Sequence, residues 1–490
     1  MVKRLGQPIA ADNYIAGTWK SGGGAKVAVT SPYDNEAMGY YHESLEADVD
    51  EAVQAAAAAY TDWASTPLKE RCSLLFKVRD SLLHKLEDIA NIVALESGKT
   101  IGEARAGLLK GIEVLEFATA LQNSDLGGKS AVSRGVHCEY RRYPLGVVGS
   151  ITPFNFPAMV PFWTIPIAIA LGNAYVWKPS EKTPCASVPL TEIFSEAGLP
   201  PGILTVVQGG KKVAETICTH PKIAAVGFVG SSAAAEAVYQ QATKKGKRAL
   251  ALGGAKNHII LLPDADLALS GKGIADSFTG CAGQRCMAAS VLLAVGDVDH
   301  LIESIKSHAQ SVQLGQSMGA IITQEQRLCL EDAVSAAEKR GAKILLDGRK
   351  PDVPKEFPNG NWFGPTILDQ VNPSDLAARD EMFGPILTIV RCATITEALD
   401  IQNSNPYGNA CSVFTSNGGL AEKVVDSAHC GMAGINIGVP VPREPFSFGG
   451  IGQSRFGHGD ITGYGGVEFW SQLKKITTKW NQQSDANWMS

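Results

Sequence analysis

Hydrophobic residues follow two different periods along this chain. Between residues 47 and 117 they recur at helical spacing, which predicts helices over 47–64 and 68–97 and further helical structure to Phe117. From residue 146 onward, short apolar runs alternate with segments of helical pattern. The runs predict strands at 146–151, 174–177, 204–207 and 225–229. Alternation of this kind is typical of a parallel sheet with helices on both faces.

One of the connecting helices has clear boundaries in the sequence. Thr183 followed by Pro184 predicts its start, with a hydroxyl cap and proline in the first turn, and Gly198 predicts its end. A second α/β series follows, with strands expected at 258–262, 291–295, 342–346 and 434–437. The chain therefore belongs to the α/β class, with two α/β domains.

Two further segments alternate between polar and apolar residues. Residues 126–145 carry paired glycines and a turn signal, which favour an exposed hairpin, and residues 467–478 favour a strand. Both would leave unpaired sheet edges in a monomer. We therefore expect this part of the chain to contact another subunit.

Composition favours small-molecule chemistry. The 490 residues carry a formal charge of −5, with no basic patch for nucleic acid. The N-terminus lacks a signal or transit pattern, and the apolar stretch 157–171 is shorter than the roughly 20 residues that a bilayer requires. Ten scattered cysteines indicate reduced thiols, and hence a cytoplasmic location. Cys281 and Cys286 have no second ligand pair nearby, so no metal site is expected.

Cys286 is the candidate nucleophile. Small residues surround it in the sequence, which lets a ligand approach the backbone, and Arg285 beside it favours the reactive thiolate. Asn155, which follows a predicted strand, can donate its side-chain amide to an oxyanion, together with the backbone N–H of Cys286. The alternatives are that Cys286 is a buried apolar residue and that Asn155 only shapes the turn before Pro157.

Three further segments predict a dinucleotide site. Lys178 and Glu181 follow a strand, at the edge where α/β sheets bind ligands, and the carboxylate favours NAD over NADP. Ser231, after Gly230, begins a helix that could hold a pyrophosphate. Glu381 and Phe383 could contact the nicotinamide ribose and ring, although their hexapeptide could also be a simple turn. The glycines at 22–24 have no strand before them and predict a loop.

In their order and spacing these motifs resemble the aldehyde dehydrogenase superfamily from about Tyr14 to Trp480. The motifs are Pro-Phe-Asn-Phe-Pro (153–157), Lys-Pro-Ser-Glu (178–181), Phe-Val-Gly-Ser (228–231), Gly-Gln-Arg-Cys (283–286) and Glu-Met-Phe-Gly-Pro (381–385). Within this superfamily, the chain is most similar to the CoA-acylating methylmalonate and malonate semialdehyde dehydrogenases. The similarity is carried by Gly-Gly-Ala-Lys-Asn-His (253–258) and Gly-Ile-Asn-Ile-Gly-Val-Pro (434–440).

The resemblance implies an aldehyde dehydrogenase-like fold. A Rossmann-type NAD-binding domain would cover 1–125 and 146–250, and a catalytic domain with the thiol would cover 251–445. An oligomerisation arm at 126–145 and 466–480 would make a homo-oligomer, a dimer or more readily a tetramer.

The resemblance also implies residue roles. Cys286 would be the nucleophile and Asn155 an oxyanion donor. Lys110 and Arg285 would hold a substrate carboxylate, although the subfamily has arginine where this chain has Lys110. NAD would contact Thr152, Phe154, Lys178, Glu181, Lys182, Ser231, Gly253 and Glu381.

The resemblance also implies how the acyl group is released from Cys286. Hydrolytic relatives carry a glutamate base where we align Ala251, so the acyl group is expected to leave on coenzyme A. The expected reaction is NAD-dependent oxidation of methylmalonate or malonate semialdehyde to propanoyl- or acetyl-CoA and carbon dioxide. One alternative is a hydrolytic enzyme that uses Glu468, His458 or Asp460 as base and releases a free acid. A non-catalytic binding protein is the other.

Overall fold

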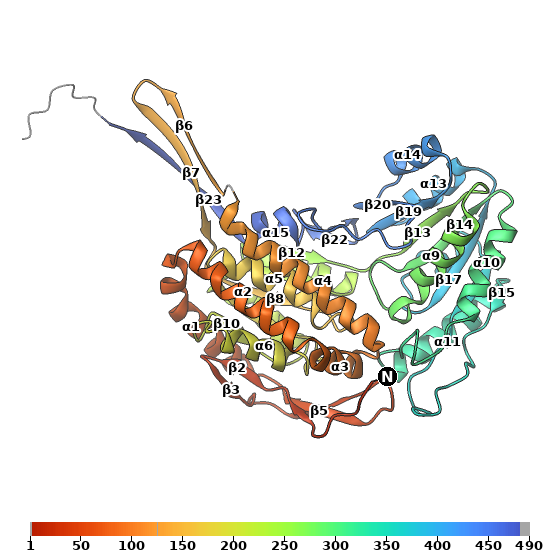
Figure 1. Ribbon diagram of the computed structural model, residues 1–490, viewed down its shortest axis with the longest axis horizontal. Coiled ribbons are helices and arrows are strands. Elements are labelled where there is room, and N and C mark those ends of the chain that lie inside the picture. The colour runs from red at the N-terminus through yellow and green to blue at the C-terminus, as the bar shows by residue number, and fades with distance from the viewer. Residues whose placement is uncertain (1, 125, 481–490) are drawn as a thin grey trace, which may run out of the picture.

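The computed structural model describes residues 2–124 and 126–480 (Figure 1). Its largest sheet has eight strands. The five strands at its centre are parallel, and three antiparallel strands lie at its edges. In spatial order they are β22 (Arg455–Gly457), β12 (Arg248–Leu252), β11 (Ile223–Val229), β8 (Val147–Ile151), β9 (Ala174–Lys178), β10 (Leu204–Val206), β2 (Asn13–Ile15) and β3 (Thr18–Lys20). The strands predicted from the apolar runs are confirmed.

The strand order reverses between β8 and β11. From β8 the chain adds β9 and β10 on one side and then returns to add β11 and β12 on the other. In such sheets the connecting helices lie on both faces, and a crevice forms at the carboxyl ends of the two strands where the order reverses. The connecting helices are α5 (Met159–Ala170), α6 (Ser187–Glu196), α7 (Lys211–Thr219) and α8 (Ser232–Lys244).

The N-terminal helices cover this sheet. They are α1 (Glu46–Ser65), α2 (Leu68–His84), α3 (Leu86–Ser97) and α4 (Ile101–Ala120), followed by the short η1 (Leu121–Asn123). The single helix predicted over 68–97 is wrong, because Lys85 leaves helical geometry (φ −93°, ψ 11°) and separates α2 from α3. A break of one residue hardly changes the spacing of the apolar positions, so periodicity does not reveal it.

The predicted start of α6 is also wrong. Thr183 does not cap this helix, which begins at Ser187, and its hydroxyl donates instead to the Phe154 carbonyl at 3.3 Å. The backbone N–H groups of Cys185 and Ala186 donate to the Glu96 carboxylate, at 2.8 and 3.1 Å. Glu96 lies on α3 and is fully buried, which raises its pKa to about 8. The acceptor for this turn thus comes from another helix.

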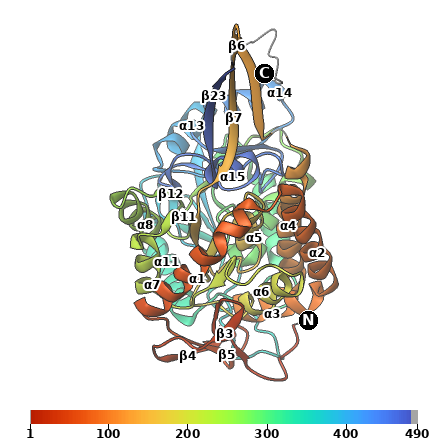
Figure 2. The same ribbon diagram turned by 90° about the vertical axis from the view of Figure 1, so that its left-hand side faces the viewer.

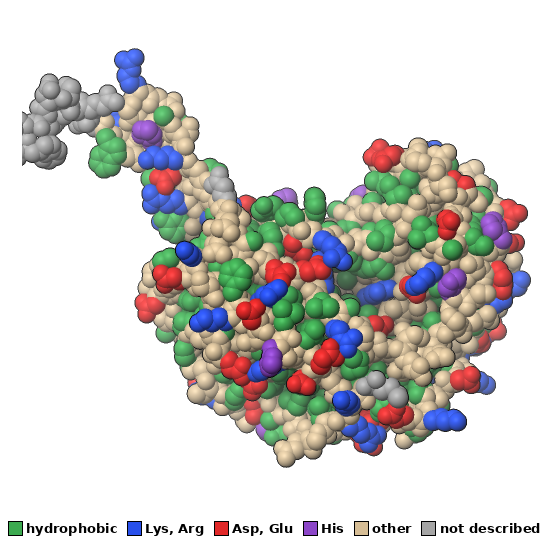
Figure 3. Space-filling view, in the orientation of Figure 1, with side chains coloured by type: hydrophobic (Ala, Val, Ile, Leu, Met, Phe, Trp, Pro, Cys, Tyr) green, Lys and Arg blue, Asp and Glu red, His purple; other side chains and the backbone are tan. Residues whose placement is uncertain are grey.

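A seven-stranded sheet forms the second half of the protein, and Figure 3 shows the surface hollowed between the two halves. Its strands are β15 (Lys343–Leu346), β16 (Thr366–Asp369), β17 (Ile386–Cys392), β14 (Ala289–Val295), β13 (Asn257–Leu261), β19 (Ala410–Phe414) and β20 (Met432–Ile435), all parallel except β15. Its helices are α9 (Leu267–Thr279), η2 (Gly280–Gly283), α10 (Asp299–Gln310), α11 (Gln324–Lys339), α12 (Leu376–Arg379), α13 (Ile395–Ser404) and α14 (Gly418–Ser427). The predicted second α/β series is confirmed, whereas β16, β17 and β19 were not predicted.

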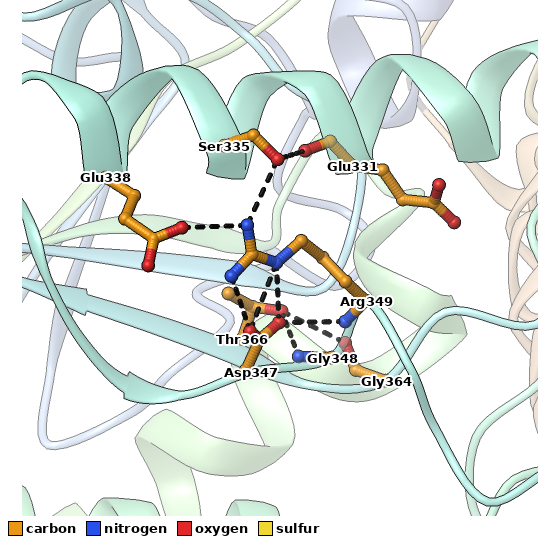
Figure 4. A network of polar contacts seen from close by, with 8 residues as sticks. All are labelled: Glu331, Ser335, Glu338, Asp347, Gly348, Arg349, Gly364 and Thr366. Carbon is orange, nitrogen blue, oxygen red and sulfur yellow. Dashed lines mark hydrogen bonds and ion pairs between the residues drawn. The ribbon is translucent and has the colours of Figure 1, made fainter.

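A network of polar contacts fixes the loop after β15 to α11 (Figure 4). The Arg349 guanidinium donates to Ser335 and Glu338 of α11, at 3.0 and 2.9 Å, and pairs with Asp347 at 2.6 Å. This network is remote in the fold from the strand ends at which the sheet order reverses, and we assign it a structural role.

Residues 126–145 form the predicted hairpin, made of β6 (Gly127–Ser133) and β7 (Val136–Pro144). The strand β23 (Ser471–Lys479) pairs with β7, and the three strands extend away from the rest of the protein (Figures 1 and 2). The C-terminal prediction is correct from Ser471 onward, but residues 467–469 belong to the helix α15 (Gly463–Phe469).

The remaining strands form two small sheets. They are β1 (Ile9–Ala10), β5 (Ala37–His42) and β4 (Lys26–Thr30) in one, and β18 (Tyr407–Gly408) and β21 (Ile451–Gly452) in the other. The apolar stretch 157–171 contains the buried helix α5, as expected. No helix among the described residues has both the length and the apolar content to cross a membrane.

Candidate active site

A cavity of about 740 Å³ lies where the strand order of the eight-stranded sheet reverses. It is bounded by the segments that follow β8, β9 and β11, and it reaches the loop before β14. Its walls include every residue predicted to be catalytic or to bind the dinucleotide: Thr152, Phe154, Asn155, Lys178, Glu181, Lys182, Ser231, Gly253, Cys286, Glu381 and Phe383. The fold thus brings together segments that lie far apart in the sequence.

The loop that carries Cys286 has an unusual backbone. Cys281, Ala282 and Gly283 have φ angles of 55°, 51° and 66°, in the left-handed region that L residues rarely adopt. A side chain at Gly283 would lie 2.1 Å from the Gly384 carbonyl oxygen, so only glycine fits. The Cys281 N–H donates to the carboxylate of Glu103, on α4, at 2.5 Å. The surrounding structure therefore holds a conformation that the loop would not adopt alone.

Amide side chains fix the nucleophile and its neighbour. The Cys286 carbonyl oxygen accepts hydrogen bonds from Asn257 Nδ2 at 2.7 Å and from Asn409 Nδ2 at 2.8 Å. The buried Gln284 side chain donates to the Ala320 carbonyl at 3.1 Å and accepts from the Ile322 N–H at 3.0 Å. These anchors were not predicted, although Gln284 stands in the quoted Gly-Gln-Arg-Cys motif.

Asn155 contacts the same loop. Its Nδ2 donates to the Gln284 carbonyl oxygen at 3.0 Å, which uses one of the two amide hydrogens. No other described group accepts from this amide. Asn155 can therefore brace the loop and still offer a hydrogen to an oxyanion beside Cys286.

The surroundings of the Cys286 thiol raise its pKa and favour the neutral form. Burial is the main cause that raises its pKa, to about 12, and the negative charge of Glu381 adds to it. Arg285 and Lys99 act in the opposite direction. Because only the thiolate attacks well, the reaction must remove this proton.

Glu381 is the carboxylate that acts on the thiol. Burial raises its pKa to about 7, while the Ala255 N–H, which donates to Oε1 at 2.9 Å, and Lys256 lower it. A side chain on Gly254 would lie 2.2 Å from Glu381 Oε2, which explains the glycine. Glu381 can thus be neutral or ionised near pH 7.

The opposite end of the cavity fits a dinucleotide. The Lys178 ammonium is buried, donates to the Gly209 and Pro179 carbonyls at 2.5 and 2.6 Å, and lies 3.5 Å from Glu181 Oε2. Glu181 itself is about half exposed, at 46%. Ser231 is the N-cap of α8 without a hydrogen bond from its side chain to the helix, and Ser231, Ala233 and Ala234 of this helix start line the cavity. This set suits ribose hydroxyls and a pyrophosphate.

The two predicted substrate cations do not line this cavity. The Lys110 ammonium pairs with Glu444 at 2.8 Å and with Glu113 at 3.0 Å. The Arg285 guanidinium turns back to the end of α9 and donates to the Asp276 and Ser277 carbonyls at 2.6 and 2.9 Å. Both cations therefore already have partners within the protein, and only Glu444 is distant in the sequence.

The residues considered for hydrolysis are also elsewhere. Glu468 is exposed and pairs with Arg142, and Asp460 pairs with Arg455 at 3.1 Å. His458 is exposed, and none of the three lines the cavity. Ala251 is fully buried inside β12, beside Phe228, and it does not line the cavity either. A glutamate side chain at position 251 would therefore lie buried in the sheet, next to Phe228.

Metal chemistry finds no support in the described residues. They contain no group of three or more His, Cys, Asp or Glu side chains arranged to hold an ion. All ten cysteines are described, and all are free thiols in this structure.

The chain was compared with known proteins. A model of the aldehyde dehydrogenase family matches residues 19–476. Malonate-semialdehyde dehydrogenase 1 of Geobacillus thermodenitrificans is 40% identical over 477 residues, which cover 96% of this chain and 98% of that protein.

Two solved structures are similar over their whole length. The methylmalonate-semialdehyde dehydrogenase of Oceanimonas doudoroffii has a TM-score of 0.95 and 35% identity, with 98% of this chain and 99% of that chain covered. A candidate methylmalonate-semialdehyde dehydrogenase of Sinorhizobium meliloti, solved with NAD, also has a TM-score of 0.95 and 35% identity, over 98% and 100% of the two chains.

Proposed function

The chain belongs to the aldehyde dehydrogenase family, and we propose that it oxidises a short semialdehyde with a carboxylate, using NAD and coenzyme A. The observation that carries this proposal is one cavity that holds Cys286, Asn155 and the dinucleotide residues but none of the three predicted hydrolytic bases. The similar proteins named for malonate and methylmalonate semialdehyde support the substrate class. The predicted cytoplasmic location and the predicted division into domains, whose boundary at 250 falls within β12, remain proposals.

Cys286 begins the reaction. The thiol proton passes to solvent water, the sulfur forms a bond to the aldehyde carbon, and the electron pair of the C=O π bond moves to the oxygen, which becomes an oxyanion. Asn155 Nδ2 and the Cys286 N–H donate to that oxygen. The residues of the dinucleotide site would hold NAD, which would supply the acceptor for the hydride that leaves the carbon. A thioester on Cys286 is then the product of the first half of the reaction.

Coenzyme A would complete the cycle. Its thiolate attacks the thioester carbonyl, the new C–S bond forms, and Cys286 leaves. Malonate and methylmalonate semialdehyde carry their carboxylate on the carbon next to the acyl carbonyl. This carboxylate is lost as carbon dioxide and a proton takes its place on that carbon, which gives acetyl-CoA or propanoyl-CoA respectively. Alternatively, water attacks the thioester and a free acid is released.

Product analysis tests the function. The protein is incubated with malonate semialdehyde, NAD and coenzyme A, and the products are identified by mass spectrometry. We expect acetyl-CoA and carbon dioxide in equal amounts, with one NADH for each. Free acid as the main product in the presence of coenzyme A would favour the hydrolytic alternative, and no NADH would favour a non-catalytic protein.

Glu181 is expected to select NAD. A 2′-phosphate near this carboxylate is repelled, so kcat/KM for NAD should exceed that for NADP at least roughly tenfold, or about 1.4 kcal/mol. Steady-state kinetics with both cofactors measure the ratio, and Glu181→Gln should reduce it because the charge is removed. Equal kcat/KM values in the unmodified protein would contradict this role.

The arm is expected to join subunits. It carries exposed apolar side chains, with Val132 at 56% and Tyr140 at 45%, and the outer edges of β6 and β23 pair with no other described strand. We therefore expect a dimer or, more readily, a tetramer of the 51.8 kDa chain. Light scattering at micromolar concentration measures the mass, and a monomer mass would refute the prediction. A variant that lacks residues 127–144 is the control for the arm.

A further inference from the structure

Lys256 is a buried cation in the connection between β12 and β13. The residue is 2% exposed, and its Nζ has no hydrogen-bond partner among the described residues. A buried charge is costly unless another charge or a polar group compensates it. The position of this ammonium therefore requires an explanation.

The backbone just before Lys256 encloses the Glu381 carboxylate. The Ala255 N–H donates to Oε1 of Glu381 at 2.9 Å. On the other side, a side chain at Gly254 would lie 2.2 Å from Oε2, so the chain approaches both carboxylate oxygens. The connection that carries Lys256 therefore also fixes the place of the carboxylate.

A second, small cavity brings Lys256 and Glu381 to a common wall. Its volume is about 10 Å³, and both residues line it together with Arg285. Glu381 also lines the 740 Å³ cavity that holds Cys286 and the dinucleotide residues, whereas Lys256 does not. Lys256 thus meets the carboxylate from behind and does not face a ligand directly.

The other ionisable groups around this pair leave Lys256 as the cation that acts on Glu381. Burial keeps three of them uncharged at pH 7, because it raises the pKa values of Cys286 and Tyr407 and lowers that of His258. The Arg285 guanidinium donates to the Asp276 and Ser277 carbonyls, and Asp380 is exposed.

The charge of Lys256 itself is present at neutral pH. Burial lowers its pKa to about 8, while Glu381 and Asp380 oppose that effect. In return, Lys256 lowers the pKa of Glu381, which burial raises to about 7. The ammonium and the carboxylate therefore favour each other's charged form.

We propose that Lys256 is a positioning residue for NAD binding, because its charge keeps Glu381 ionised and ready to accept hydrogen bonds from the nicotinamide ribose. This rests on the proposed function, in which Glu381 contacts that ribose. Hydrogen bonds to an ionised acceptor are roughly twice as strong as those between neutral groups. Lys256 would then determine how low the pH can fall before NAD binding weakens.

The pH dependence of NAD binding in Lys256→Met tests the proposal. Binding is followed by protein fluorescence from about pH 6 to pH 9, without aldehyde or coenzyme A. In the unmodified protein, NAD should bind more tightly as the pH rises and Glu381 loses its proton. Methionine removes the charge, so the pKa of Glu381 should rise and the profile should move to higher pH by roughly one unit, the low end of the effect of a nearby opposite charge.

The size of the effect should depend on pH. Near pH 7 the Kd of Lys256→Met for NAD should be roughly three- to tenfold higher than that of the unmodified protein, because a neutral acceptor binds the ribose more weakly. Near pH 9 the two proteins should converge, because Glu381 is ionised in both and Lys256 has lost its own charge.

Three variants are the controls. Glu381→Gln removes the titrating carboxylate, so the pH dependence should disappear, and adding Lys256→Met to it should cause no further loss. Lys256→Arg keeps the charge and should return the profile towards that of the unmodified protein. Lys272→Met removes a positive charge from the surface of α9, where the side chain is 66% exposed, and should leave the profile unchanged.

Three results would overturn the proposal. An unchanged profile in Lys256→Met would mean that the cation does not act on Glu381. An equal loss at every pH, repeated in the Glu381→Gln background, would mean that Lys256 serves only the fold. A pH dependence that survives Glu381→Gln would exclude the carboxylate as its source, and this comparison does not require Lys256→Met to fold. Absence of NAD binding at every pH in the unmodified protein would instead contradict the proposed function itself.

Discussion

Without coenzyme A, the protein is expected to form about one NADH per active site and then to slow by roughly 100- to 10,000-fold, the usual contribution of a positioned base. Water attacks a thioester quickly only when such a base is near. Glu468, His458 and Asp460 lie away from the cavity, and residue 251 is an alanine buried in the sheet. Coenzyme A brings a strong nucleophile, so its addition should restore turnover. Stopped-flow absorbance of NADH measures both phases.

The control for this experiment is Cys286→Ala, which should lose even the burst because no thioester can form. Full turnover without coenzyme A, with release of free acid, would contradict the prediction. Glu381 would then be the first candidate base, since it lines the cavity and burial raises its pKa to about 7. In that case Glu381→Gln should abolish the coenzyme A-independent rate.

Replacing Asn155 with alanine is expected to lower the acylation rate about 100- to 1000-fold, the cost of removing one oxyanion donor. The Asn155 amide already donates to the Gln284 carbonyl, so its remaining hydrogen has a fixed direction. Single-turnover NADH formation measures the effect. Dinucleotide binding, followed by fluorescence, should change little because Lys178 and Glu181 remain.

A structural role for Asn155 predicts a different result. If it only shapes the turn before Pro157 and anchors Gln284, the burst should fall less than tenfold and thermal stability should fall with it. Alkylation of Cys286 by iodoacetamide provides the control for the loop, since a displaced loop would change its rate. An unchanged alkylation rate with a large loss of acylation would support the role as oxyanion donor.

Local sequence determined most strands of the eight-stranded sheet and the candidate pair Cys286 and Asn155. Apolar runs of strand length mark β8, β9, β10 and β11, because side chains in a buried parallel sheet must be apolar on both faces. Cys286 and Asn155 stand out because small residues, proline turns and strand ends surround them, and these features are local. Their motifs also carry the family resemblance, which the comparisons confirm.

The tertiary structure alone decided how the charged groups are used. Lys110 is neutralised by Glu444, which lies 334 residues further along the chain, and the N-terminal turn of α6 is held by Glu96 of α3. A long charged side chain can reach many partners, and which one it meets depends on segments brought together only in the fold. The sequence therefore determined which residues carry charge. Packing decided that Lys110 is paired with Glu444 and Glu113.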